Sequence, residues 1–93
     1  MVTTVIFIVR STDALVEVPR LTDLLAKTEP NEVVCDVSRL SAGLDAVETI
    51  ARLRLAAGRA NATMRVSRAA EPLTDLLVAV GLDDVLAMGN DAA

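Results

Sequence analysis

The chain has 93 residues, of which 53% are hydrophobic and 24% are charged, and its formal net charge is −4. This length suits a single folded domain, and this apolar content argues against a disordered chain. The excess of acidic residues disfavours nucleic-acid binding, because proteins that contact a phosphate backbone are normally basic over one face.

Membrane insertion and common catalytic chemistry are also disfavoured. No apolar run approaches the roughly 20 residues that span a bilayer, and the N-terminus lacks the features of a signal peptide, so we expect a cytoplasmic protein. The sequence contains no histidine and a single cysteine, Cys35, so the commonest general base and the usual zinc ligand sets are missing. We therefore expect no metal, no cofactor and no enzymatic activity. Cys35 itself is expected to be a buried strand residue.

The first half of the chain is predicted to form a strand, a helix and a second strand. Residues 2–9 are almost continuously apolar and β-branched, which is typical of a strand covered on both faces. A polar turn over residues 10–13 leads to a helix with Pro19 in its first turn. Residues 32–37 form the second apolar strand. The apolar face of the helix consists of Val18, Leu21, Leu24 and Leu25.

A long helix is predicted from about residue 44 to residue 59. Glu48 can pair with Arg52 across one turn, and Thr49 lies on the same polar side. The apolar stripe of this helix is predicted to consist of Leu44, Val47, Ile50, Ala51, Leu55 and Gly58, widened by Ala46, Leu53 and Ala57.

The remaining residues predict a third strand and a shorter helix. The strand covers residues 62–66, and Gly81 is expected to end the helix in the left-handed position of a Schellman motif. Residues 83–88 form a short closing element, and residues 89–93 form a frayed tail.

The fold class that follows is α/β. The chain is predicted to be one small domain over residues 1–93, with a core over about residues 3–88 and a mostly parallel sheet in a β-α-β-α-β-α order. The two apolar strands require cover on both faces. Either helices lie on both sides of the sheet, or a partner or terminal segment covers the second side.

The loop after the second strand is the candidate site, because such loops commonly carry function in parallel sheets. Asp36, Ser38 and Ser41 gather there. In one interpretation Ser41 caps the long helix and Asp36 binds loop amides. In the other, the loop is a docking or phosphorylation site. Catalysis is disfavoured because the serines have no histidine to activate them, and no glycine-rich phosphate loop is present.

Four segments together resemble the STAS domain of bacterial anti-sigma factor antagonists. Residues 33–40 are similar to a strand of that family that ends in Asp or Asn, and residues 51–61 are similar to its long helix. Residues 64–67 resemble the next strand. Residues 71–86, with a Gly-Leu-x-x-Val-Leu ending, resemble the closing helix and carry the most specific likeness. The resemblance covers about residues 5–86 and implies a STAS-like fold, with a trimmed beginning.

The resemblance also implies a position for a regulatory site. In regulated members an Asp-Ser-Ser-Gly motif opens the long helix, and the partner kinase phosphorylates its second serine and so abolishes binding. Counted back from Asn61, this motif falls on residues 43–46, with Asp45 at the phosphoacceptor position. Asp45 would then supply a constant negative charge, and Ser41 and Ser38 are displaced candidate acceptors. Asp45 is equally consistent with an ordinary acidic residue in the first turn of a helix.

The leading hypothesis is therefore a STAS-like protein-protein interaction module in bacterial transcription regulation, without the usual phosphoacceptor serine. Its expected partner is an anti-sigma factor or a histidine-kinase-like ATPase. Another hypothesis is a structural or assembly subunit, either a homodimer or part of a larger complex, with no phospho-switch. Nucleotide binding at the same loop is a third. The expected binding residues are Asp36, Ser38, Arg39, Ser41, Gly43, Asp45 and Glu48.

Overall fold

The computed structural model describes residues 3–86 and contains one sheet with helices on one of its sides. The elements in chain order are β1 (Thr4–Ile8), α1 (Ala14–Thr28), β2 (Glu32–Asp36), α2 (Leu44–Arg59), β3 (Thr63–Ser67), α3 (Glu71–Ala79) and the 3-10 helix η1 (Asp83–Leu86). This order confirms the predicted α/β class and its β-α-β-α-β-α sequence. The predicted tail over residues 89–93, and the last two residues of the predicted core, lie outside the described residues.

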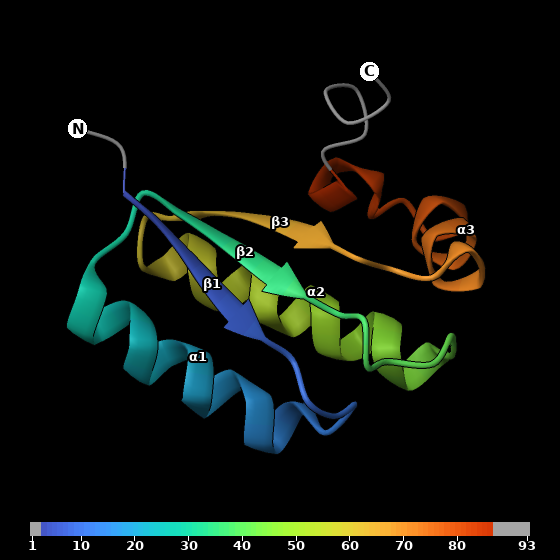
Figure 1. Cartoon of the computed structure of the whole chain (residues 1–93), viewed down its shortest axis with the longest axis horizontal. Helices are drawn as coiled ribbons and strands as arrows, with labels where there is room; N and C mark the ends of the chain where they lie inside the picture. The colour runs from blue at the N-terminus through green and yellow to red at the C-terminus, as the bar shows by residue number, and fades with distance from the viewer. Residues whose placement is uncertain (1–2, 87–93) are drawn as a thin grey trace.

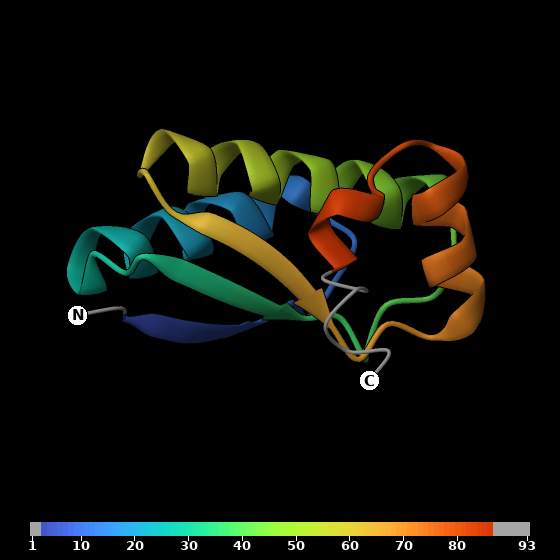
Figure 2. The same cartoon turned by 90° about the horizontal axis from the view of Figure 1, so that it is seen from above.

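The sheet has three parallel strands in the order β1-β2-β3 (Figure 1). Because the strand order follows the chain order, successive crossovers of the same hand place their helices on the same face. Figure 2 shows α1 and α2 on one side of the sheet, while α3 lies beyond the ends of the strands. Cover by helices on both sides, one of the two expected arrangements, is therefore wrong for residues 3–86.

Burial alternates along the strands as this one-sided cover requires. Phe7, Val33, Cys35, Met64 and Val66 are buried against the helices. On the opposite face, Ile6 is 70% exposed and Ile8 is 43% exposed. The continuous apolar run of the first strand thus conceals an ordinary alternation, because its outward residues are also apolar.

Helix α1 begins at Ala14, four residues before Val18, which is the first residue of the predicted apolar face. Asp13 is its N-cap, and the Asp13 carboxylate accepts a hydrogen bond from the Leu15 N–H at 3.0 Å. Pro19 therefore lies inside the helix, and the prediction of a first-turn proline is wrong. At the other end Glu29 adopts a left-handed conformation, with a φ of 45°, before Pro30.

Helix α2 has the predicted bounds but buries only part of the predicted apolar face, together with Thr49. Leu44 is 76% exposed and Leu55 is 60% exposed, whereas Thr49 is 1% exposed. The Thr49 hydroxyl lies 2.8 Å from the carbonyl oxygens of both Thr12 and Asp45, so its burial leaves no polar group unsatisfied. The buried residues of this helix are Ala46, Thr49, Ile50, Leu53 and Ala57.

The predicted Schellman end of α3 is confirmed. The Leu82 N–H donates to the Leu77 carbonyl at 2.8 Å, the Gly81 N–H donates to the Val78 carbonyl at 3.1 Å, and Gly81 has a φ of 85°. The chain then turns into η1, which contacts β3. No helix within residues 3–86 is both long enough and apolar enough to cross a lipid bilayer.

Candidate functional site

The candidate site lies where the loops that follow the parallel strands come together. The loop after β2, residues 37–43, lies at the same end of the sheet as the loops after β1 and β3 (Figure 1). The structure therefore brings residues from three separate parts of the sequence to this edge, as is usual where parallel strands end.

Asp36 anchors the loop after β2. Its carboxylate accepts a hydrogen bond from the Ser38 N–H at 2.9 Å, which confirms the expected bond to a loop amide. The Arg68 guanidinium, from the loop after β3, lies 3.9 Å from the second carboxylate oxygen. The pKa of Asp36 lies below its ordinary value. The largest cause is the hydrogen bond from the Ser38 N–H, followed by the Ser38 hydroxyl and by the positive charges of Arg68 and Arg39. Asp36 is therefore a stable anion near neutral pH.

Asp45 joins the start of α2 to the loop after β1. One carboxylate oxygen accepts a hydrogen bond from the Thr12 hydroxyl at 3.0 Å, and the other accepts one from the Ala46 N–H at 2.9 Å. A β-carbon on Gly43 would lie 2.9 Å from the Asp45 carboxylate, so the glycine leaves room for this arrangement. The residue remains exposed, and its negative charge lies at the positive end of the helix dipole.

Ser41, in the loop after β2, does not cap helix α2. The N-cap of α2 is Gly43, which makes no side-chain cap bond, so the prediction that Ser41 caps this helix is wrong. Ser38, Arg39 and Ser41 are all exposed. Their side chains are therefore open to solvent, and Ser38 and Arg39 lie near the Asp36 carboxylate.

Glu48 forms the predicted pair with Arg52, with a shortest nitrogen–oxygen distance of 2.9 Å. Both side chains are well exposed, so the pair contributes only about 0.3–0.5 kcal/mol. They also line a groove of about 590 Å³ between α1 and α2, whose apolar walls include Leu15, Val18 and Leu55. Glu48 thus belongs to this groove as well as to the start of the helix.

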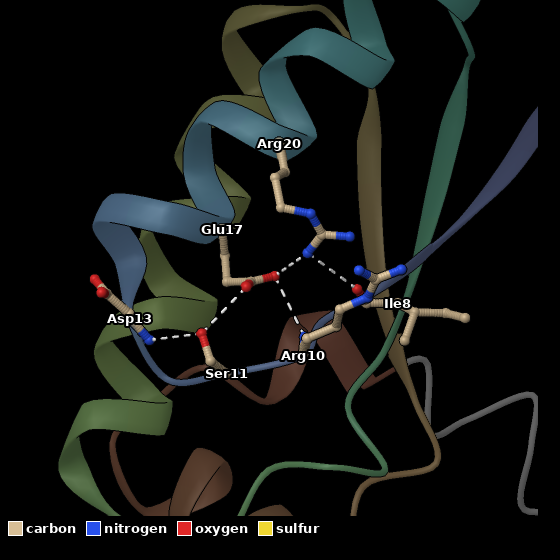
Figure 3. A network of polar contacts seen from close by, with 6 residues as sticks. All are labelled: Ile8, Arg10, Ser11, Asp13, Glu17 and Arg20. Atoms are coloured by element: carbon tan, nitrogen blue, oxygen red, sulfur yellow. Dashed lines mark hydrogen bonds and ion pairs between the residues drawn. The ribbon is translucent and has the colours of Figure 1, made fainter.

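A buried carboxylate beside the site was not among the predicted residues. Glu17 is 1% exposed, and Figure 3 shows it surrounded by donors. It accepts hydrogen bonds from the Arg10 N–H at 3.3 Å, the Ser11 hydroxyl at 3.1 Å and the Arg20 guanidinium. The signal in the sequence is its spacing: Glu17 precedes Leu21 and Leu25 by one and two turns, so it shares their buried face.

The structure offers little for redox or metal chemistry in the described part of the chain. Cys35 is fully buried, and burial raises the pKa of its thiol to about 12, so the reactive thiolate is disfavoured. Within residues 3–86, no group of three or more acidic or cysteine side chains is placed to hold a metal ion.

Comparison of the chain with protein-family models, with curated protein sequences and with solved structures gives no match. The likeness to STAS domains therefore depends on the sequence segments alone.

Proposed function

We propose that this protein is a STAS-like binding module that acts by protein–protein contact, with a docking surface formed by the loop after β2 and the first turns of α2. The proposed contact residues are Asp36, Ser38, Arg39, Ser41, Gly43, Asp45 and Glu48. The partner is an anti-sigma factor or a histidine-kinase-like ATPase, as the resemblance implies. Asp45 carries the proposal, because an exposed carboxylate lies in the first turn of α2, where the resemblance places the phosphoacceptor.

Asp45 acts in this proposal as a constant negative charge. Its bonds to Thr12 and to the helix N–H hold the carboxylate in one orientation. In the regulated members a phosphate at this position abolishes binding, so Asp45 keeps the module partly in the weakly binding form. The mimicry is partial because a carboxylate carries one charge and a phosphate carries about −1.5 to −2.

The test is a titration of the protein with a purified anti-sigma kinase of the STAS-binding class. Asp45→Asn keeps the shape and removes the charge, so we expect the dissociation constant to fall by about 3- to 10-fold. Asp45→Ser should bind in the same range and accept phosphate from ATP in the presence of the kinase. Asp75→Asn, an exposed change on α3, is the matched control and should leave binding unchanged. Absence of binding by the wild type and both Asp45 variants would refute the proposal.

The second candidate function is a structural or assembly subunit with no phospho-switch. The uncovered face of the sheet favours it, because Ile6 and Ile8 are exposed apolar residues that a second copy or a larger complex would bury. Sedimentation velocity over a wide concentration range separates the two functions: a stable dimer supports assembly, whereas a monomer supports the binding module.

A further inference from the structure

The outer edge of β1, the edge that does not face β2, presents unpaired backbone groups. The Val9 N–H donates to the Asp36 carbonyl at 3.0 Å, so alternate residues from Val9 back along the strand direct their backbone toward β2. Thr4, Ile6 and Ile8 therefore direct their N–H and C=O groups outward. In agreement, the Ile8 carbonyl points to the outer side, where it accepts a hydrogen bond from the Arg20 guanidinium at 3.5 Å, so the groups left unpaired are those of Thr4 and Ile6 and the Ile8 N–H. No strand within residues 3–86 pairs with this edge.

The outer edge of β1 also lacks the features that protect edge strands from pairing. Its sequence, TVIFI, contains no charged residue and no proline. The opposite edge of the sheet is different, because β3 contains Arg65 and is contacted by η1. Within residues 3–86 the two edges of the sheet therefore differ, and the edge of β1 has no charged strand residue and no pairing strand.

A hollow of about 370 Å³ lies along the outer edge of β1, below α1. Its apolar lining is Ile6, Phe7, Ile8 and Leu24, and its charged lining is Arg10, Arg20 and Asp23. Helix α1 lies in the layer on one side of the sheet (Figure 2), and in the view of Figure 1 it extends past β1 on the side away from β2. An added strand would therefore be covered by α1 on one face. On the other face it would extend the exposed surface of the sheet that carries Ile6 and Ile8.

The charge along this hollow selects the occupant. Arg20 is paired with Glu17, and Asp23 is paired with Lys27. Arg10 is exposed and forms no ion pair within residues 3–86, so it leaves one positive charge at the end of β1 where the strand terminates (Figure 3). A carboxylate is the complementary group.

We propose that the outer edge of β1 binds one extended peptide segment by strand addition, with an acidic residue next to Arg10. The backbone N–H and C=O of Ile6 and the N–H of Ile8 pair with the peptide, and its alternate side chains enter the hollow. The position of α1 disfavours a second copy of this chain. Two β1 strands paired about a twofold axis would lie about 4.8 Å apart. Each α1 extends past its own β1 toward the other copy, and packed helices need roughly 8–10 Å between their axes, so the two α1 helices would occupy the same space.

The probe is the hexapeptide Val-Thr-Val-Thr-Val-Asp, labelled with fluorescein and blocked at both ends, and its binding to the whole chain is followed by anisotropy. Its control peptides carry asparagine in place of aspartate, or N-methyl groups on alternate amides. Ile6→Pro removes one outward N–H without removing a bond to β2. We expect it to weaken binding by at least about 10-fold, and Arg10→Gln or the asparagine peptide to weaken it by about 3- to 10-fold. Arg59→Gln, an exposed arginine on α2, should have no effect.

A second measurement keeps the test independent of how the proline variant folds. At saturating probe, hydrogen exchange at the Ile6 and Ile8 amides should slow by at least about 10-fold, because both donors become bonded. Equal binding of the N-methylated peptide, or unchanged exchange at these two amides, overturns the proposal. So does a wild-type dimer that protects the same amides without the probe, because the edge would then belong to a second copy.

Discussion

Glu17 is the residue whose surroundings say most about how the loop after β1 is held. A carboxylate that is 1% exposed must be compensated, and three donors from Arg10, Ser11 and Arg20 provide this. The Arg20 guanidinium also lies 4.9 Å from the centre of the Phe7 ring, so the same group ties α1 to β1. Glu17 thereby connects the start of α1 to the loop after β1. The same loop contains Thr12, which donates a hydrogen bond to Asp45.

Replacement of Glu17 by alanine should lower the free energy of unfolding by about 2–3 kcal/mol, because Arg20 and two other donors lose their acceptor. Glu17→Gln keeps an acceptor and should cost less. Urea unfolding followed by circular dichroism measures both. Glu48→Ala removes an exposed ion pair and is the control, with an expected loss below about 0.5 kcal/mol. Equal losses for Glu17→Ala and Glu48→Ala would show that the buried network is not stabilising.

Two glycines, Gly81 at the end of α3 and Gly58 inside α2, test how backbone conformation affects stability. Gly81 has a φ of 85°, and a β-carbon there would meet nothing within 4 Å, so alanine is disfavoured by backbone conformation alone. We expect Gly81→Ala to destabilise the protein by about 1 kcal/mol. Gly58→Ala, inside α2 and equally open, should stabilise it by about 0.5–1 kcal/mol. Thermal unfolding of the two variants would contradict this account if both moved in the same direction.

The elements also show what local sequence signals can and cannot predict. The bounds of α2 were predicted from its helical periodicity, and the Schellman end at Gly81 was predicted because a glycine breaker acts within a few residues. The buried face of α2 was predicted only in part, because two stripes have helical spacing, one through Leu44 and Leu55 and one through Leu53 and Ala57. Only packing against α1 and the sheet decides between them, and it buries the stripe that contains Thr49.

At the scale of the whole molecule, the same limit applies to the candidate site. The turn at Asp36 and the pair of Glu48 with Arg52 could be predicted, because each is a contact within one turn of chain. The contact of Asp45 with Thr12 spans 33 positions, so it depends on how the first crossover packs against the second. The general rule for parallel sheets predicted the edge, but the arrangement of side chains along it required the three-dimensional structure.

The one-sided cover of the sheet predicts unequal tolerance to mutation on the two faces of β1. Phe7 is 4% exposed below the helices, so Phe7→Ala should lower the free energy of unfolding by about 3–4 kcal/mol. Ile6 is the adjacent residue and is 70% exposed, so Ile6→Thr should cost less than about 0.5 kcal/mol, because threonine keeps the β-branched side chain that strands prefer. Urea unfolding at two protein concentrations measures both changes. A large cost for Ile6→Thr that grows with protein concentration would mean that a second copy covers this face, and the assembly function would then be favoured over the binding module.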